Sequence, residues 1–117
     1  MILFTLLAMQ VAVSGIADDA EGCTDKEGPR ALSACYSDHA TQWELRMEKA
    51  YANAFKSPNG YDRAALARSQ TQWIKYRHSE CDFYAKQKGT MGYIQSSYCH
   101  LDLNRRRALE LEAIPLP

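Results

Sequence analysis

The segment SQTQWIKYRHSEC, residues 69–81, brings a tryptophan, a tyrosine, an arginine, a histidine, a glutamate and a cysteine into about three to four helical turns. His78 and Cys81 are three residues apart, so on a helix they could share a metal ion or act as a nucleophile and its base. Both kinds of chemistry need a free thiolate. The chemistry of this segment therefore depends on whether Cys81 is free or oxidised.

The cysteines of the chain are few and even in number: Cys23, Cys35, Cys81 and Cys99 among 117 residues. Such a count in a small exported domain is typical of a disulfide framework. The separations of 12, 46 and 18 residues include no C-x2-C pair and match no zinc motif. We therefore predict two disulfides, which leave no thiol for catalysis and no cysteine ligand for a metal.

The other ionisable residues do not predict a catalytic site. His39, His78 and His100 lie on three different segments and are expected to be exposed polar side chains. Glu44 and Glu48 are four residues apart on an expected solvated helix face, and no carboxylate pair is placed as glycoside hydrolysis requires. The sequence thus predicts a protein that is not an enzyme and carries no cofactor or metal.

Charge limits the class of partner. The chain has 14 basic and 14 acidic residues and a formal net charge of zero, whereas nucleic-acid binding needs an excess of basic residues. Arg105 and Arg106, which begin a run of three arginines, are expected to face solvent and to pair with Glu110 and Glu112 at helical spacing. We therefore exclude nucleic acid and expect no long-range steering toward a strongly charged partner.

The N-terminal residues have the pattern of a secretory signal peptide. The apolar run 2–13 is too short to span a bilayer comfortably, and the small residues Gly15 and Ala17 follow it. We predict a signal peptide of residues 1–17, cleaved after Ala17. Because no basic residue precedes the apolar run, an amphipathic or buried first helix is the alternative.

The first cysteine of the mature chain does not look like a lipid-attachment site. Cys23 lies late relative to the apolar run, and Glu21 is unsuited to a lipobox. We expect one mature domain, residues 18–117, that is periplasmic or secreted and has no stable membrane anchor after signal cleavage.

Hydrophobic spacing predicts an all-α domain. Apolar residues recur at three- and four-residue steps over residues 29–55, with Pro29 at the first helical position. Thr41 and Glu44 could form a capping box, so a short helix followed by a longer one is the alternative. We expect either one long helix or these two in the first part of the domain.

Two breaks separate the remaining helices. Residues 56–62 contain Pro-Asn-Gly, and Asp62 can cap a second helix that continues to about Lys86. Residues 88–93 hold two glycines, and a third helix is expected over 93–113 with Ile94, Tyr98, Leu101, Ala108 and Leu111 on one side. The predicted fold is a small disulfide-stapled bundle of three main helices, with a short N-terminal helix as an addition.

The second break suggests how the cysteines pair. Cys81 and Cys99 each lie nine residues from Thr90, so in an antiparallel helix hairpin they come level with each other. A Cys81–Cys99 disulfide would join the second and third helices. Cys23–Cys35 would then tie the N-terminal arm to the start of the first helix.

Two polar residues lie on a helix face that must meet the other helices. Gln70, Trp73 and Arg77 share this face, and a tryptophan there is ordinary core. The glutamine and the arginine are expected either to be buried with hydrogen-bond partners or to line a groove that contacts a partner.

The spacing of these residues resembles the LprI-like family of small exported bacterial domains. Its pattern is met in order by Gln70, Trp73, Tyr76, Arg77 and Cys81, and the resemblance extends from the first cysteine pair to about residue 111, through Tyr51, Cys99, Arg107 and Leu111. Two positions depart from it: Met47-Glu48 replaces the usual Leu-Asn, and Asn104 replaces a typical threonine. These departures bear on polar contacts rather than on the fold.

The resemblance implies an exported binding protein, with lysozyme-type muramidases as the protein partner. Two loops, residues 57–61 and 88–93, carry Gly and Tyr and could enter a sugar-binding cleft. The expected binding residues are Tyr61, Gln70, Arg77, Lys88 and Tyr93. A neutral chain is less suited than an acidic one to a cationic lysozyme. The alternative is a structural or envelope-stress domain that binds another periplasmic protein or a cell-wall fragment.

Overall fold

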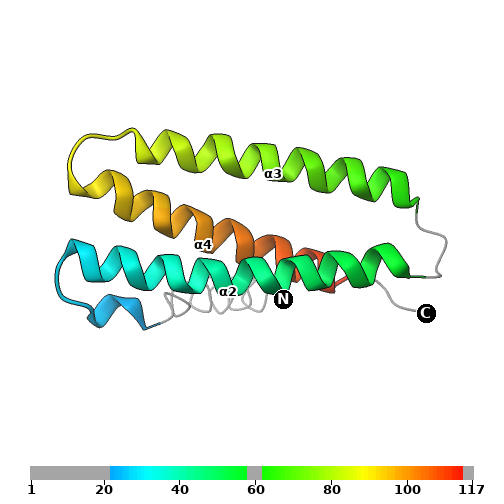
Figure 1. The fold of residues 1–117 in the computed structure, drawn as a ribbon, viewed down its shortest axis with the longest axis horizontal. Coiled ribbons are helices and arrows are strands. Elements are labelled where there is room, and N and C mark those ends of the chain that lie inside the picture. Colours follow the sequence, from blue (N-terminus) through cyan, green and yellow to red (C-terminus); the bar gives the residue numbers. More distant parts are fainter. Residues whose placement is uncertain (1–21, 58–61, 115–117) are drawn as a thin grey trace, which may run out of the picture.

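The computed structural model describes residues 22–57 and 62–114. It contains a short 3-10 helix, η1 (Cys23–Asp25), and three long helices, α2 (Pro29–Lys56), α3 (Arg63–Ala85) and α4 (Thr90–Glu112), and these described residues include no strand (Figure 1). The predicted all-α class with three main helices is confirmed. The predicted signal peptide, residues 1–17, and the candidate residue Tyr61 lie outside the described residues.

The first long helix, α2, is continuous through the position where a second start was an alternative. Pro29 occupies its first turn, where the missing N–H of proline is tolerated. Thr41 lies inside the helix, and its Oγ1 donates a hydrogen bond to the carbonyl oxygen of Ser37 at 3.1 Å rather than capping a new helix. The buried residues Ala40, Met47, Ala50 and Ala54 continue one apolar face across this point, which favours a single helix.

The ends of α3 and α4 follow from caps and from glycine. The carboxylate of Asp62 accepts a hydrogen bond from the backbone N–H of Ala65 at 3.0 Å, which confirms the predicted cap of α3. The third helix starts at Thr90, three residues earlier than predicted, since only Gly89 of the two glycines adopts a positive φ (81°). Gly92 belongs to the first turn of α4.

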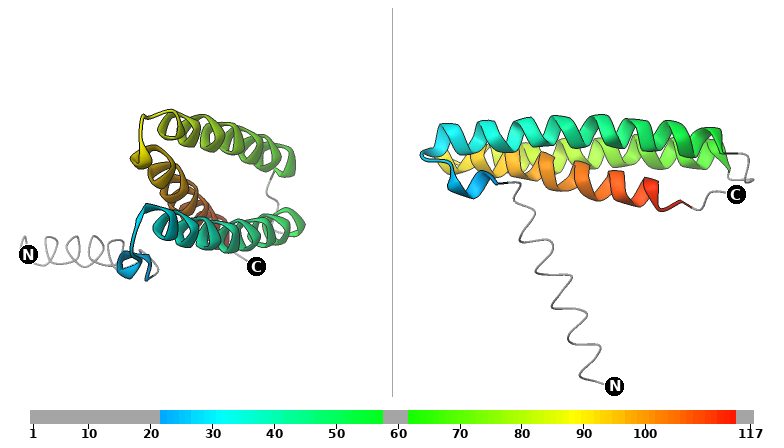
Figure 2. Two further views of the ribbon diagram at one scale, coloured as in Figure 1. Left: turned by 60° about the vertical axis from the view of Figure 1, so that its left-hand side comes forward. Right: turned by 90° about the horizontal axis from the view of Figure 1, so that it is seen from below.

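Helix α4 lies between the other two helices and packs against both, whereas α2 and α3 scarcely touch each other (Figures 1 and 2). The core cluster consists of Met47 and Ala50 from α2 with Ala108 and Leu111 from α4, and partly buried aromatic residues surround it. The alanines allow α2 and α4 to approach closely. Helix α3 depends on α4 for almost all of its packing.

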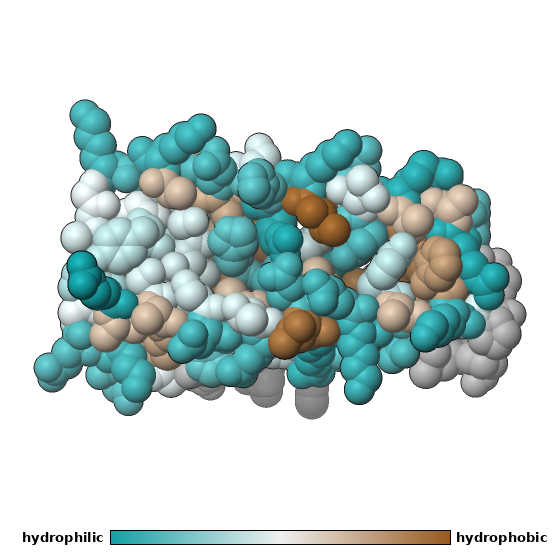
Figure 3. Space-filling view, viewed as in Figure 1, coloured by the Kyte–Doolittle hydropathy of each residue, from teal (hydrophilic) through white to brown (hydrophobic). Residues whose placement is uncertain are grey.

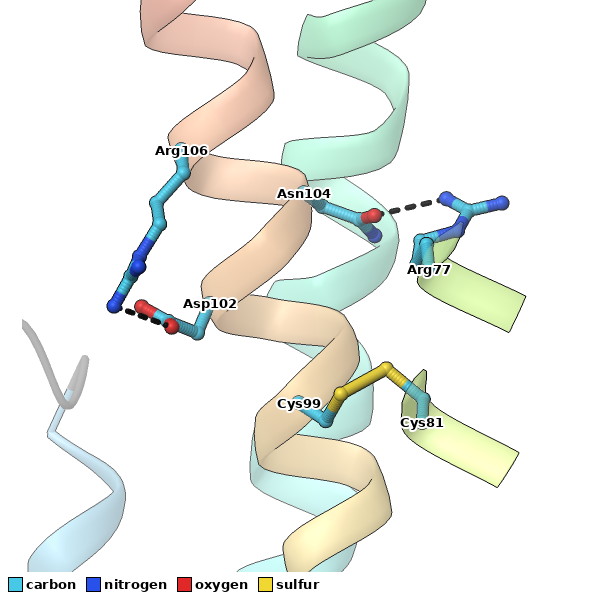
Figure 4. The surroundings of a disulfide bond; sticks show 6 residues. All are labelled: Arg77, Cys81, Cys99, Asp102, Asn104 and Arg106. Carbon is cyan, nitrogen blue, oxygen red and sulfur yellow. Dashed lines mark hydrogen bonds and ion pairs between the residues drawn. A yellow bond between two sulfur atoms is a disulfide. The ribbon is translucent and has the colours of Figure 1, made fainter. Parts of the chain in front are cut away.

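Both predicted disulfides are present. Cys23 pairs with Cys35, and Cys81 pairs with Cys99, with Cα–Cα distances of 5.7 and 5.5 Å. The second bond joins α3 to α4 (Figure 4). The thiol chemistry considered for Cys81 is therefore excluded in this state of the chain. Within residues 22–57 and 62–114, none of the helices combines the length and apolarity of a bilayer-spanning segment.

Replacing Gly92 by alanine is expected to lower the free energy of unfolding by about 1–3 kcal/mol. The new Cβ would overlap the backbone carbonyl oxygen of Gln87 in the loop before α4, and backbone cannot move aside as a flexible side chain can. Urea denaturation followed by circular dichroism measures the change. Met91→Ala, in the same turn but at an exposed side chain, is the control and should change stability by less than about 0.5 kcal/mol. An unchanged midpoint for Gly92→Ala would show that the loop relaxes.

Candidate binding surfaces

Arg77 is oriented into the bundle. Its Nη1 donates a hydrogen bond to Oδ1 of Asn104 at 2.8 Å and lies 3.4 Å from Oε1 of Glu44 (Figure 4 shows the contact with Asn104). Asn104, which is 1% exposed, donates in turn from Nδ2 to the carbonyl oxygen of Ala40 at 3.0 Å. This chain of contacts runs from α3 through α4 to α2, so Arg77 links two helices that otherwise hardly meet.

Gln70 is also engaged inside the fold. Its Oε1 accepts a hydrogen bond from Nε of Arg107 at 2.9 Å. The guanidinium carbons of Arg77 and Arg107 lie 5.2 and 5.9 Å from the centre of the Trp73 ring, within the range of a cation–π interaction. The polar residues of this face therefore have partners within the bundle. Whether Gln70 and Arg77 also contact a partner is not tested by this geometry and stays a prediction.

The prediction that Arg105 faces solvent is wrong. Its side chain is 5% exposed and pairs with Asp102 at 2.9 Å, whereas the exposed Arg106 pairs with the other oxygen of Asp102 at 3.0 Å. Arg105 lies one turn from the buried residues Leu101 and Ala108, and a carboxylate three residues away makes its burial tolerable. Arg105 can therefore be buried on α4 because its counter-ion, Asp102, lies on the same helix.

Glu112, which was expected to pair with the arginines of α4, pairs with a residue of α2 instead. Glu112 accepts two hydrogen bonds from Arg46 of α2, at 2.6 and 2.8 Å, and this contact lowers the pKa of the Glu112 carboxyl. Both side chains are substantially exposed, so this contact between α2 and α4 adds little to stability.

The predicted loop residues lie far from Gln70. Lys88 is exposed just after α3, and Tyr93, 42% exposed, lies in the first turn of α4. Gln70 to Ala85 alone spans about 22 Å of helix rise. The described members of the predicted set, Gln70, Arg77, Lys88 and Tyr93, are thus divided between the interior and one exposed end, and they do not form a single site.

A groove between α3 and α4, not predicted from the sequence, has a volume of about 470 Å³. One wall is a stripe of α3 at four-residue spacing, Tyr76, Glu80 and Tyr84. Tyr36 of α2 also lines the groove. The remaining lining residues belong to α4: Ile94, Gln95, Tyr98, Cys99, Asp102, Leu103 and Arg106. Ile94 and Tyr98, expected with the core face, line this groove instead. The four-residue spacing of Tyr76, Glu80 and Tyr84 was the available sequence signal.

The rings in the groove are ordered by mutual contact. Tyr36 and Tyr98 meet edge to face, with ring centres 5.2 Å apart and an interplanar angle of 67°. Burial, together with the nearby Tyr98 hydroxyl, raises the pKa of the Tyr36 phenol, so this hydroxyl is a neutral hydrogen-bonding group at neutral pH. Tyr76 is 51% exposed and Tyr98 36% exposed, which leaves ring surface open to a ligand.

The charges of the groove are unevenly compensated. Asp102 is held by Arg105 and Arg106, and Figure 4 shows Asp102 and Arg106 projecting from a different side of α4 than Asn104. Glu80 is half-buried, yet its carboxylate has no hydrogen bond or ion pair with the part of the chain that the structure describes. One carboxylate of the groove is therefore uncompensated.

A second, smaller cleft of about 220 Å³ lies between α2 and α4. Two of its serines are engaged: Ser37 donates to Oγ of Ser97 at 3.1 Å, and Oγ of Ser97 also lies 2.8 Å from Oγ of Ser33. Burial, and then the nearby Arg77, lowers the pKa of His100 in this cleft. Ser37 and Ser97 therefore have hydrogen-bond partners within the fold.

A family model matches most of the chain. The family model described as "Lysozyme inhibitor LprI" matches residues 23–111. The chain belongs to the LprI family. No curated protein and no solved structure matches it. The matched segment contains both disulfides and nearly all of the three long helices. The match therefore covers almost the whole of the described fold.

The residues that carried the resemblance to the LprI family hold the helices together. Trp73 packs beside the core and under two arginines, Arg107 bonds Gln70, and Cys81 forms the staple to α4. Asn104, where the family pattern has threonine, is the hub that receives Arg77. This LprI protein thus uses an amide at a position where a shorter hydroxyl would reach fewer partners.

Proposed function

We propose that this LprI protein is an exported, non-enzymatic binding protein of the bacterial envelope that inhibits a lysozyme-type muramidase. The observation that carries the proposal is the family match, which extends from Cys23 to Leu111 and therefore over all the described helices except the last residue of α4. Two disulfides in so small a domain suit an oxidising compartment outside the cytoplasm.

The groove chemistry supports binding rather than hydrolysis. A glycosidase needs two carboxyl groups at a defined separation, one to donate a proton and one to act as nucleophile or base. In the groove, Asp102 is engaged by two guanidinium groups, so Glu80 has no free carboxyl partner there. The face in Figure 3 is mostly hydrophilic with scattered hydrophobic residues, as expected of a domain that is stable alone and binds through limited areas.

The test is a lysis assay with the mature protein, residues 18–117, and several purified lysozymes acting on a cell-wall suspension. The expected result is that the rate of turbidity loss falls as the protein is added and levels off near equimolar ratio for at least one lysozyme. Reduced and alkylated protein is the control, since it lacks both disulfides. Full lytic rates for every lysozyme at large molar excess of the protein would contradict the proposal.

A cell-wall fragment is the second candidate ligand, and the four tyrosines of the groove favour it. Tyrosine faces stack on the apolar faces of sugar rings, and their hydroxyls bond to sugar hydroxyls. Calorimetric titration with soluble peptidoglycan fragments, in the absence of lysozyme, separates the two candidates. Binding of fragments together with no protection against lysozyme would favour this second function.

A further inference from the structure

We propose that the groove between α3 and α4 receives a basic side chain, arginine or lysine, of the protein partner, with Glu80 as its counter-ion. The inference rests on the proposed function and names the chemistry of the partner at the contact. It assigns the recognition surface to residues outside the two loops considered from the sequence.

The first argument is the shape and polarity of the groove. Exposed rings stand on both walls, Tyr76 on α3 and Tyr98 on α4, while Leu103 and Ile94 add apolar lining. Lysine and arginine have long aliphatic stems that cover apolar surface while the charged end reaches a polar group. A volume of about 470 Å³ admits such a side chain with its neighbours.

The second argument is charge. Glu80 is partly removed from water and has no cation beside it in the described chain, which is unfavourable for a carboxylate. The faces of aromatic rings are also negative, so the rings and the carboxylate together attract a cation. Arg106 does not meet this need, because Asp102 holds it. A neutral sugar can donate hydroxyls to Glu80 but leaves its charge uncompensated.

The third argument is preorganisation. Glu80 and Tyr98 directly precede Cys81 and Cys99 in the sequence, so the disulfide fixes the distance between one carboxylate wall and one aromatic wall. A site whose walls are held by a covalent bond loses little entropy on binding.

The carboxylate of Glu80 can also attract a basic partner although the chain has no net charge. With 14 basic and 14 acidic residues the chain offers no general attraction to a basic protein. A single unpaired carboxylate between aromatic rings supplies attraction at one place, where the binding energy of an interface is commonly concentrated.

The experiment compares inhibition constants and dissociation constants for the lysozyme that the wild type inhibits. Glu80→Gln keeps the shape and removes the charge, and Tyr76→Ala removes one exposed ring. Each is expected to weaken binding on the order of tenfold or more, and Glu80→Gln should also reduce the dependence of affinity on salt. Glu48→Gln, an exposed carboxylate on α2, makes the same change in net charge and should leave affinity within about twofold.

Thermal unfolding confirms that each variant is folded; neither Glu80 nor the half-exposed Tyr76 supports the core. If the wild type inhibits and Glu80→Gln binds as tightly as Glu48→Gln, the groove inference is overturned and the proposed function stands. If the wild type inhibits no lysozyme, both are overturned. If peptidoglycan fragments bind the groove, with loss in Tyr76→Ala and no loss in Glu80→Gln, the groove is a sugar site and the inference is wrong.

Discussion

Replacing Asn104 by leucine is expected to lower the free energy of unfolding by about 3 kcal/mol. The leucine removes the acceptor at 2.8 Å from Nη1 of Arg77 and the donor to the carbonyl oxygen of Ala40. The guanidinium of Arg77 stays mostly buried, and its Nε already makes no hydrogen bond with the described residues. Glu44, 3.4 Å away, offsets part of the loss, which places the effect at the low end for a broken buried pair. Urea denaturation gives the value.

Two further variants isolate the contact between Asn104 and Arg77. Asn104→Thr, which restores the residue of the family pattern, keeps a hydroxyl as acceptor and should lose less than the leucine variant. Arg77→Met combined with Asn104→Leu removes the charge with its acceptor and should recover much of the stability. A double variant as unstable as the sum of the two single variants would contradict the assignment of Asn104 as the essential partner of Arg77.

Local signals in the sequence predicted the elements of the fold well. The three helices follow from hydrophobic spacing, Asp62 caps α3 through a contact three residues away, and the cysteine pairing follows from symmetric distances to one turn. Each of these depends on residues close in sequence or on a single hairpin. The start of a second, longer helix near Thr41 was an alternative because a capping pattern is only a local preference, which a continuous buried face overrides.

The residues that were misjudged depend on the arrangement of all three helices. Arg105 has the spacing of a buried residue, but its charge argued for solvent, and only the pairing with Asp102 resolves the conflict. Tyr98 and Ile94 share a helical face with the buried Leu101, yet they line the groove, and Tyr98 remains 36% exposed. Periodicity shows which residues share a face, and it does not show how far a neighbouring helix covers that face.

The hydrogen-bond partners of Gln70 and Arg77 could not be predicted from the sequence for the same reason, since they lie on other helices. Their partners, Arg107 and Asn104, are 37 and 27 residues away in sequence, and no local pattern connects them. The family pattern contained most of these residues without showing that they meet. The groove, by contrast, is formed by residues outside that interior network.

Removing the disulfide between α3 and α4, by replacing Cys81 and Cys99 with alanine, is expected to lower the free energy of unfolding by about 3 kcal/mol. The bond closes a loop of 18 residues in the unfolded chain, and α3 has little packing apart from α4. Chemical denaturation of the oxidised proteins measures the loss, with free-thiol titration to confirm that the other disulfide is intact. The same variant should bind the proposed lysozyme partner at least about tenfold more weakly, because the disulfide no longer holds the segments that carry Glu80 and Tyr98 together.

The Cys23–Cys35 bond provides the matched control for this second effect. It closes a loop of 12 residues, so replacing both cysteines by alanine should lower stability by a similar amount, about 3 kcal/mol. That bond joins η1 to α2 and does not connect α3 with α4. The groove residue Tyr36 follows Cys35, but it lies inside the continuous helix α2 and its ring contacts Tyr98, so affinity should change little under conditions where the variant is folded. Equal losses of affinity in the two disulfide variants would show that general stability, and not the spacing of α3 and α4, governs binding. A selective loss in the variant lacking Cys81 and Cys99 would place recognition in the groove, since the two variants differ in which helices they release.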